Sequence, residues 1–221
     1  MLAGVVAAQA AGGAPAPIVQ PGAPGAASRV ISAETAVAMS RPTFTEHDVA
    51  FMQHMIVHHA QAVEMVEMLE TQGSDPTVKL LGRRISLSQE AEMALMRGWL
   101  TDRGQSVEMP MAGMDHSGME HSGMDHSAHA GHAMSADDTP VMAGMLSPRQ
   151  MRTLSAATGT EFDRLFLTGM IQHHQGAIDM VDALMDTPDA ADDPLLSDFA
   201  NSVVGDQTAE IARMQTLLSD L

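Results

Sequence analysis

The sequence predicts an all-α protein in which two repeated helical hairpins form an antiparallel four-helix bundle, with a disordered insert rich in Met and His. Three observations lead to this fold class: an internal repeat, apolar residues at three- and four-residue spacing, and helix-capping residues near the start of the repeated segments. The apolar faces of the two hairpins can be buried only against each other, so we expect a single bundle.

The internal repeat consists of two blocks. Residues 48–69 align with 163–184 without a gap, and residues 75–100 align with 193–218 after a loop whose length differs by three residues. The first block pairs Met55 with Met170, His58 with His173, His59 with His174, and Met65 with Met180. The second block pairs Gln89 with Gln207, Glu92 with Glu210, and Met96 with Met214. Each repeated half is therefore expected to hold two helices.

Capping residues mark where these helices should begin. Thr45 and Thr160 each precede an acidic residue by three positions, which is the spacing between an N-cap and a first-turn acid. Asp75-Pro76 and Asp193-Pro194 each place a capping carboxylate before a proline at the first helical position. A further short helix is expected from Ser147-Pro148, ahead of the second hairpin.

Composition divides the chain into four segments. They are a signal-peptide-like start with an Ala/Pro/Gly-rich tether (1–28), the first helical hairpin (40–104), a Met/His-rich flexible insert (105–146) and the second helical hairpin (147–221). Residues 40–221 together are expected to form one domain. The insert contains no Lys or Arg and shows no helical or strand periodicity, so we expect disorder there in the absence of a ligand.

The N-terminal segment favours export to the periplasm or the extracellular space. It is apolar and rich in small residues, and "AQA" at Ala8–Ala10 resembles a small-x-small cleavage site. The basic residues that usually open a signal peptide are missing, because the first Arg is Arg29. The apolar run is too short to span a membrane. The alternative interpretation is a disordered Ala/Gly/Pro tail.

Composition also limits the function. A net charge of −17 repels phosphate backbones, which argues against nucleic-acid binding, and it attracts cations. The absence of Cys excludes disulfides, thiolate metal sites and a Cys nucleophile. Methionine is abundant, with 21 copies, whereas aromatic residues make up only 3% of the chain. Methionine can simply fill a core, so its positions must decide between packing and ligand binding.

Both hairpins carry Met and His at helical spacing. On a helix, Met55, His58 and Met65 fall within roughly 80° of one another, and the second hairpin repeats this pattern. The candidate ligands in the helices are Met55, His58, His59, Met65, Met96, Met170, His173, His174, Met180 and Met214. Core packing explains a single Met, but it explains the doubled His poorly, because burying an imidazole without a partner is costly. We therefore predict a metal site.

Copper is the metal that fits these ligands. No helix carries the Glu-x-x-His motif of di-iron bundles, and zinc prefers Cys, His and carboxylate over Met. Thioethers are soft ligands that select Cu(I), while imidazole and carboxylate also allow Cu(II). Silver, another soft monovalent ion, should follow Cu(I) into the same sites.

The insert repeats one short unit. "GMDHSGMEHSGMDHS" at residues 113–127 places a thioether, a carboxylate and an imidazole in each five-residue unit, and "AHAGHAM" follows it at 128–134. The candidate copper ligands here are Met114, His116, Met119, His121, Met124, His126, His129, His132 and Met134. We expect multiple weaker sites, because gathering ligands on a disordered chain costs entropy. The alternative is a plain linker.

The chain resembles domain-of-unknown-function family 305 (DUF305) in the blocks "FMQHMIVHHAQAVEM", "SQEAEMALMRGWL", "FLTGMIQHHQGAIDM" and "DQTAEIARMQTLL". The resemblance covers roughly 40–104 and 147–221. It implies an exported bacterial protein with a ferritin-like four-helix fold, in a family that includes CopM-type copper-binding proteins linked to copper resistance. The functional positions of the family would map to Met55, His58, His59, Met65, Met170, His173, His174 and Met180. Two departures are the replacement of His54 by Gly169 in the second half and the long insert.

The sequence thus predicts an exported protein that sequesters or passes on Cu(I), and also Cu(II), for copper tolerance. Its partners would be copper ions and other copper-handling proteins, with no nucleic acid and no membrane span. We find no nucleophile motif, phosphate-binding loop or paired-carboxylate motif, so we predict no enzymatic activity. Two alternatives remain, a metal-dependent oxidase built in the bundle and a helical interaction module that binds no metal.

Overall fold

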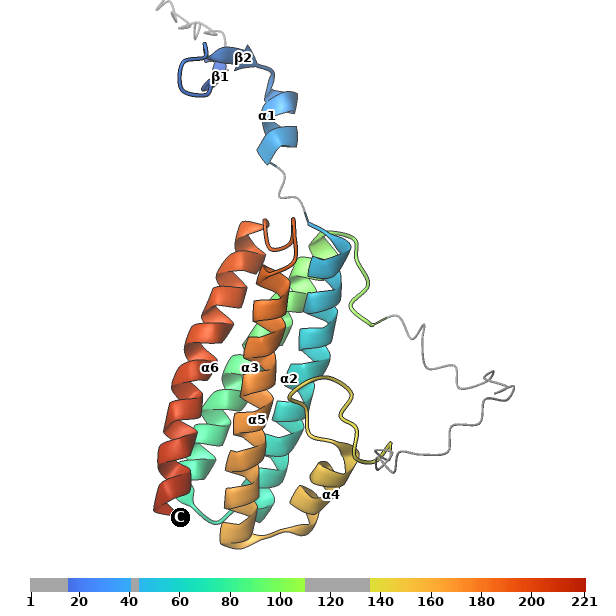
Figure 1. Ribbon diagram of the computed structural model, residues 1–221, viewed down its shortest axis with the longest axis vertical. Coiled ribbons are helices and arrows are strands. Elements are labelled where there is room, and N and C mark those ends of the chain that lie inside the picture. Colours follow the sequence, from blue (N-terminus) through green and yellow to red (C-terminus); the bar gives the residue numbers. More distant parts are fainter. Residues whose placement is uncertain (1–15, 41–43, 110–135) are drawn as a thin grey trace, which may run out of the picture. The chain divides into compact units, whose positions relative to one another are not determined.

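The computed structural model describes residues 16–40, 44–109 and 136–221, and it divides the chain into two compact units, Met1–Pro42 and Thr43–Leu221 (Figure 1). In the first unit, β1 (Ile18–Gln20) pairs antiparallel with β2 (Arg29–Ile31), and α1 (Ala33–Ser40) follows. The segment that we interpreted as a tether from its composition therefore includes a short strand.

The second unit contains a four-helix bundle. Its long helices are α2 (Glu46–Gln72), α3 (Pro76–Asp102), α5 (Gly159–Met185) and α6 (Pro194–Asp220), each of 27 residues. Helix α2 packs against α3, α5 packs against α6, and α2 and α5 join the two hairpins (Figure 1). The short helix α4 (Pro148–Ala156) precedes α5. The predicted all-α fold is confirmed. None of the described helices combines the length and apolarity needed to cross a bilayer.

Most of the predicted caps are present. The side chains of Asp75 and Asp193 each accept hydrogen bonds from two backbone N–H groups of the helix that follows, and Thr45 forms a capping box with Asp48. The prediction for Thr160 is wrong, because α5 begins one residue before it, at Gly159. The acid that was to pair with Thr160, Asp163, instead accepts hydrogen bonds from Ser74 and Asp75 in the turn between α2 and α3.

The two hairpins are tied together in a reciprocal way at their turns. While Asp163 of α5 holds the α2–α3 turn, Asp48 of α2 accepts a hydrogen bond of 2.8 Å from the backbone N–H of Ala191, in the α5–α6 loop. Both aspartates are fully buried. Because buried carboxylates require such partners, each end of the bundle fixes the register of the opposite hairpin.

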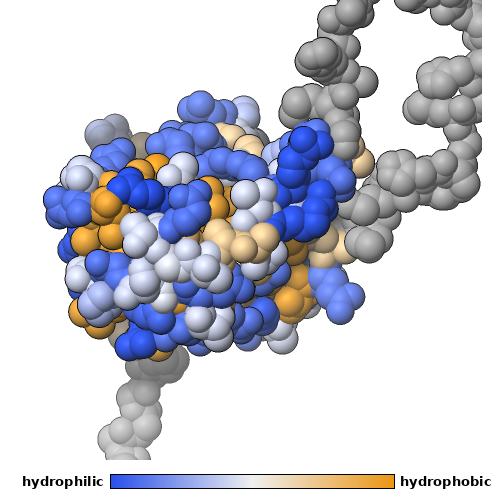
Figure 2. Space-filling view, turned by 90° about the horizontal axis from the view of Figure 1, so that it is seen from below, coloured by the Kyte–Doolittle hydropathy of each residue, from blue (hydrophilic) through white to orange (hydrophobic). Residues whose placement is uncertain are grey.

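The apolar interior forms two layers, which we call the first layer and the second layer. The first layer contains four buried methionines, Met52, Met55, Met93 and Met96. The second layer contains three, Met65, Met170 and Met214. The two layers lie on opposite sides of the middle of the bundle. In α2, Met55 of the first layer lies before the helix midpoint and Met65 of the second layer lies after it. The end of the bundle seen in Figure 2 is mainly hydrophilic with scattered apolar residues, as expected when methionine is gathered inside.

Candidate metal centre

A polar layer separates the two methionine layers at the middle of the long helices. Its members are His58, His59, Gln89, His173, His174 and Gln207, and the four histidines are completely buried. The two glutamines are 2% and 3% exposed, and neither side-chain amide has a hydrogen-bond partner among the described residues. Burying six polar side chains in a bundle core is costly unless they have partners or a ligand.

One nitrogen of each buried imidazole contacts an oxygen atom. The Nε2 of His59 lies 2.6 Å from a carboxylate oxygen of Glu92, and the Nε2 of His174 lies 2.7 Å from one of Glu210. The Nε2 of His173 lies 2.7 Å from the backbone carbonyl of His58. The Nε2 of His58 itself lies 3.3 Å from the carbonyl oxygen of Ala143. These oxygens accept hydrogen bonds, so we assign a hydrogen to each Nε2.

The other nitrogen, Nδ1, is buried in all four rings and has no hydrogen-bond partner within the described part of the chain. In a neutral imidazole that carries its hydrogen on Nε2, Nδ1 offers a lone pair. Metal-binding histidines in proteins usually donate their other ring N–H to a carboxylate or a backbone carbonyl, which fixes the ring and the tautomer. The four histidines show this arrangement, so their Nδ1 atoms are suitable for metal binding.

The two central rings are held in the neutral form. Burial, reinforced by the neighbouring His59, lowers the pKa of His58 to about 4. Burial, followed by the proximity of His58, lowers the pKa of His173 well below its ordinary value. Their ring centroids lie 3.9 Å apart across the α2–α5 interface. Neutral imidazole is the form that binds metals, so near neutral pH these two rings need not lose a proton first.

The structure separates two methionines that the helical pattern placed on one face. Met55 lies in the first layer and Met65 in the second, and ten residues of helix span about 15 Å. One ion therefore cannot be bound by both of them. Instead, Met65 packs with Met170 and Met214 of the opposite hairpin, whereas the partly buried Met180 packs against the first layer. Each methionine layer thus draws side chains from both halves of the chain.

The predicted ligands of the helices are otherwise placed in or beside the core. Met55, His58, His59, Met65, Met96, Met170, His173, His174 and Met214 are completely buried. The predicted ligands of the insert, Met114, His116, Met119, His121, Met124, His126, His129, His132 and Met134, lie outside the described residues. Across the described ranges, no three His, Asp or Glu side chains gather into a group that could hold a metal. A metal ion here would have to combine imidazole with thioether ligands.

Sequence reasoning missed several residues of this region. Met52 and Met93 add thioethers to the first layer. Their repeat counterparts are Leu167 and Ile211, so the repeat does not mark them as candidate ligands. Gln89 and Gln207 do repeat, yet their spacing alone gave no reason to expect burial. The contact of His58 with Ala143 involves a segment outside the repeat, and no signal in the sequence pointed to it.

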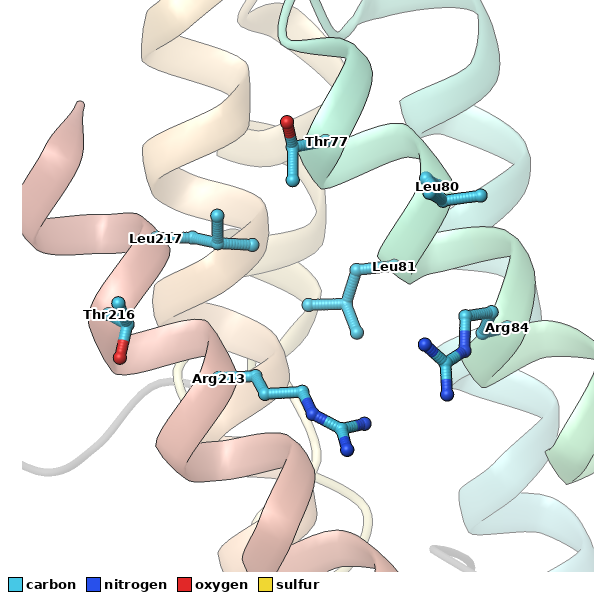
Figure 3. A pocket seen from close by; sticks show the side chains of 7 residues that line it. All are labelled: Thr77, Leu80, Leu81, Arg84, Arg213, Thr216 and Leu217. Atoms are coloured by element: carbon cyan, nitrogen blue, oxygen red, sulfur yellow. The ribbon is translucent and has the colours of Figure 1, made fainter.

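A separate groove of about 320 Å³ lies between α3 and α6. In Figure 3, Arg84 and Arg213 extend toward each other across it, next to the apolar side chains of Leu81 and Leu217. It is lined by no thioether or imidazole, so it is not part of the candidate metal centre.

Comparison with known proteins identifies the class of this bundle. Residues 48–218 match the family described as "Domain of unknown function (DUF305)", so the chain belongs to the DUF305 family. A solved DUF305 fragment from Deinococcus radiodurans is 29% identical, with a TM-score of 0.63, and covers 81% of this chain and 100% of its own.

Solved structures of a protein named CopM are also similar. The structure titled as its Cu(II)-bound form is 27% identical and the one titled as its Cu(I)-bound form is 25% identical. Both have a TM-score of 0.54, and each alignment covers 78% of this chain and 96% of CopM. No curated protein matches the sequence.

Proposed function

We propose that this protein is an exported copper-binding protein that sequesters or passes on Cu(I), and also Cu(II), through Met and His ligands for copper tolerance. The observation that carries the proposal is the set of four buried imidazoles whose Nδ1 atoms have no hydrogen-bond partner among the described residues while each Nε2 contacts an oxygen. The similar solved structures of CopM in Cu(I)-bound and Cu(II)-bound forms support the same metal.

Two sites of similar design follow from the repeat. In one, His59, held by Glu92, would bind copper together with thioethers of the first layer. In the other, His174, held by Glu210, would bind copper together with thioethers of the second layer. Thioethers favour Cu(I) and do not titrate, so protons do not compete with copper for sulfur. The Met and His residues of the insert would bind additional copper ions.

The protein would bind copper without catalytic turnover. A metal oxidase, the enzymatic alternative, would oxidise Cu(I) repeatedly in the presence of O₂. Assays of cuprous oxidation with purified protein separate these functions, because a binding protein consumes no O₂ beyond its own copper content. Copper analysis of protein from copper-grown cells separates both from a helical interaction module, which would be isolated without metal.

The sites are tested by replacing methionine with leucine, which changes side-chain volume little and keeps the core apolar. The double variant Met55→Leu/Met96→Leu should lose one tight Cu(I) equivalent in competition with a chromophoric chelator. Met185→Leu is the matched control, since Met185 is 41% exposed at the end of α5. If the double variant and the control bind Cu(I) as wild type does, the first layer is not a copper site.

A further inference from the structure

A short segment lies over the buried histidines. Residues 143–146, which we call the strap, are the last residues of the insert before α4, and they run over α2 and α5 (Figure 1). The side-chain amide of Gln61 on α2 donates to the Leu146 carbonyl at 3.0 Å and accepts from the Leu146 N–H at 2.7 Å. On α5, Gln172 donates to the carbonyls of Gly144 and Met145, at 3.3 and 3.0 Å.

Two glycines allow the strap to lie directly on the backbone of α5. Gly144 has a positive φ of 78°, which favours glycine. A Cβ atom added to Gly176 would lie 2.4 Å from the Cα of Gly144 and 2.5 Å from the carbonyl oxygen of Ala143. These are backbone atoms, so they cannot move aside as the end of a side chain does. Any larger residue at 176 must therefore displace the strap.

The strap also contacts the candidate metal centre. Its Ala143 carbonyl is the oxygen partner of the His58 Nε2 atom, at 3.3 Å. The His58 ring is completely buried, and the ring of His173 lies against it at 3.9 Å. Met145 and Leu146 are 5% and 4% exposed, so the strap closes this side of the α2–α5 interface with apolar side chains. The strap thus both orients His58 and covers it.

The two halves of the repeat hold the strap through different residues. The counterpart of Gly176 in the first half is Gln61, which is itself one of the strap's hydrogen-bond partners. The counterpart of Gln172 is Val57, whose side chain cannot form such hydrogen bonds. The strap therefore gives the two related helices different roles, and its position is not a consequence of the internal symmetry.

We propose that the strap is a gate that copper must displace to reach the polar layer from the side of His58 and His173, with Gln61 and Gln172 as its latch. This inference rests on the proposed copper-binding function. Side-chain amides and the apolar contacts of Met145 and Leu146, rather than regular secondary structure, hold the strap, so it can open without unfolding α2 or α5. Opening would also free the His58 Nε2 atom from Ala143, so the gate couples access to the orientation of the ring.

The variant Gly176→Ala tests the gate in the full-length protein. Alanine favours helix over glycine, so α5 should remain intact while the added Cβ displaces the strap. Gly205→Ala is the matched control, because Gly205 lies within α6 and an added Cβ there meets nothing within 4 Å. We expect Gly176→Ala to raise the rate of His58 modification by diethyl pyrocarbonate, and the rate of Cu(I) uptake, about tenfold or more. Gly205→Ala should leave both unchanged.

A second pair of variants tests the latch. Gln61→Ala/Gln172→Ala should accelerate the same two rates, whereas Gln175→Ala should not, since the exposed Gln175 donates its hydrogen bond to Asp179 on its own helix. Peptide mass spectrometry reports the modification of His58 without any metal. Wild-type rates of His58 modification in both Gly176→Ala and the latch variant would overturn the gate. Absence of Cu(I) uptake by the wild-type protein would instead overturn the proposed function, so the two failures are distinct.

Discussion

The two methionine layers are built alike, but the first contains four fully buried methionines and the second contains three. Met55 and Met96 of the first layer correspond in the repeat to Met170 and Met214 of the second. Met52 and Met93 of the first layer instead correspond to Leu167 and Ile211. Leucine and isoleucine fill nearly the same volume as methionine, so packing alone does not require sulfur at these positions.

This difference indicates which features both sites share and which feature distinguishes them. Both halves keep the adjacent histidines, the glutamate that holds one ring and the buried glutamine, so the polar layer is common to them. The fully buried additional thioethers, Met52 and Met93, belong to the first layer, whereas the partly buried Met68 and Met151 pack against the second. Because thioethers select soft monovalent ions, the first layer should be the tighter Cu(I) site.

The largest expected effect is a loss of stability at acidic pH, which the buried histidines of the polar layer should cause in the metal-free protein. Burial lowers the pKa of His58 from 6.5 to about 4, so the unfolded chain binds a proton there more readily than the folded protein does. The free energy of unfolding should therefore be highest above pH 6.5 and fall toward pH 4, by on the order of 3 kcal/mol for this residue. The lowered pKa of His173 acts in the same direction.

Urea denaturation at pH 7 and pH 5 measures this loss. His58→Gln should flatten the dependence on pH, whereas His47→Gln, at an exposed position of α2, should retain the wild-type slope. Equal unfolding free energies for the wild-type protein at the two pH values would show that the central histidines are not kept neutral by burial.

The second-largest expected effect is a loss of Cu(I) affinity that should be equal in the two halves of the repeat. Glu92→Gln and Glu210→Gln each weaken the charge-assisted hydrogen bond that holds a histidine ring. Each should lower the Cu(I) affinity of its own site by roughly 10–100-fold, the usual range for such outer partners of metal ligands. Competition titrations measure both values, with Glu90→Gln on the exposed side of α3 as control. A loss confined to one variant would break the equivalence of the sites.

The smallest expected effect is a difference in Cu(I) affinity between the first and the second layer. Met52→Leu/Met93→Ile gives the first layer the residues of the second, and we expect its Cu(I) affinity to fall about tenfold, equivalent to about 1.4 kcal/mol. The reverse change, Leu167→Met/Ile211→Met, should raise the affinity of the second layer. If neither exchange alters the Cu(I) affinities, the extra thioethers serve packing alone.

Much of the fold was predictable because it depends on local chemistry. The repeat, the apolar periodicity and the caps at Asp75 and Asp193 all act within a few residues, and all are present in the structure. The start of α5 was misplaced because Thr158, not Thr160, is its N-cap, and Asp163 accepts hydrogen bonds from the α2–α3 turn without pairing with Thr160. A pattern within one segment does not reveal such a contact with another hairpin.

The candidate site was predictable in ligand type but not in grouping. A helical projection shows that Met55 and Met65 share a face, but it omits their separation along the axis, which places them in different layers. The assignment of Nε2 as donor and Nδ1 as free nitrogen depends on contacts with Glu92, Glu210 and backbone carbonyls of distant segments. Such contacts arise only from the packing of the helices.

The most direct test is histidine ¹⁵N NMR of the full-length protein during titration with Cu(I). The account predicts that the Nδ1 resonances of His59 and His174 shift with the first equivalents of copper, while their Nε2 atoms stay protonated. The contradictory result would be Nδ1 resonances that do not change at saturation, with copper bound only by histidines outside the bundle.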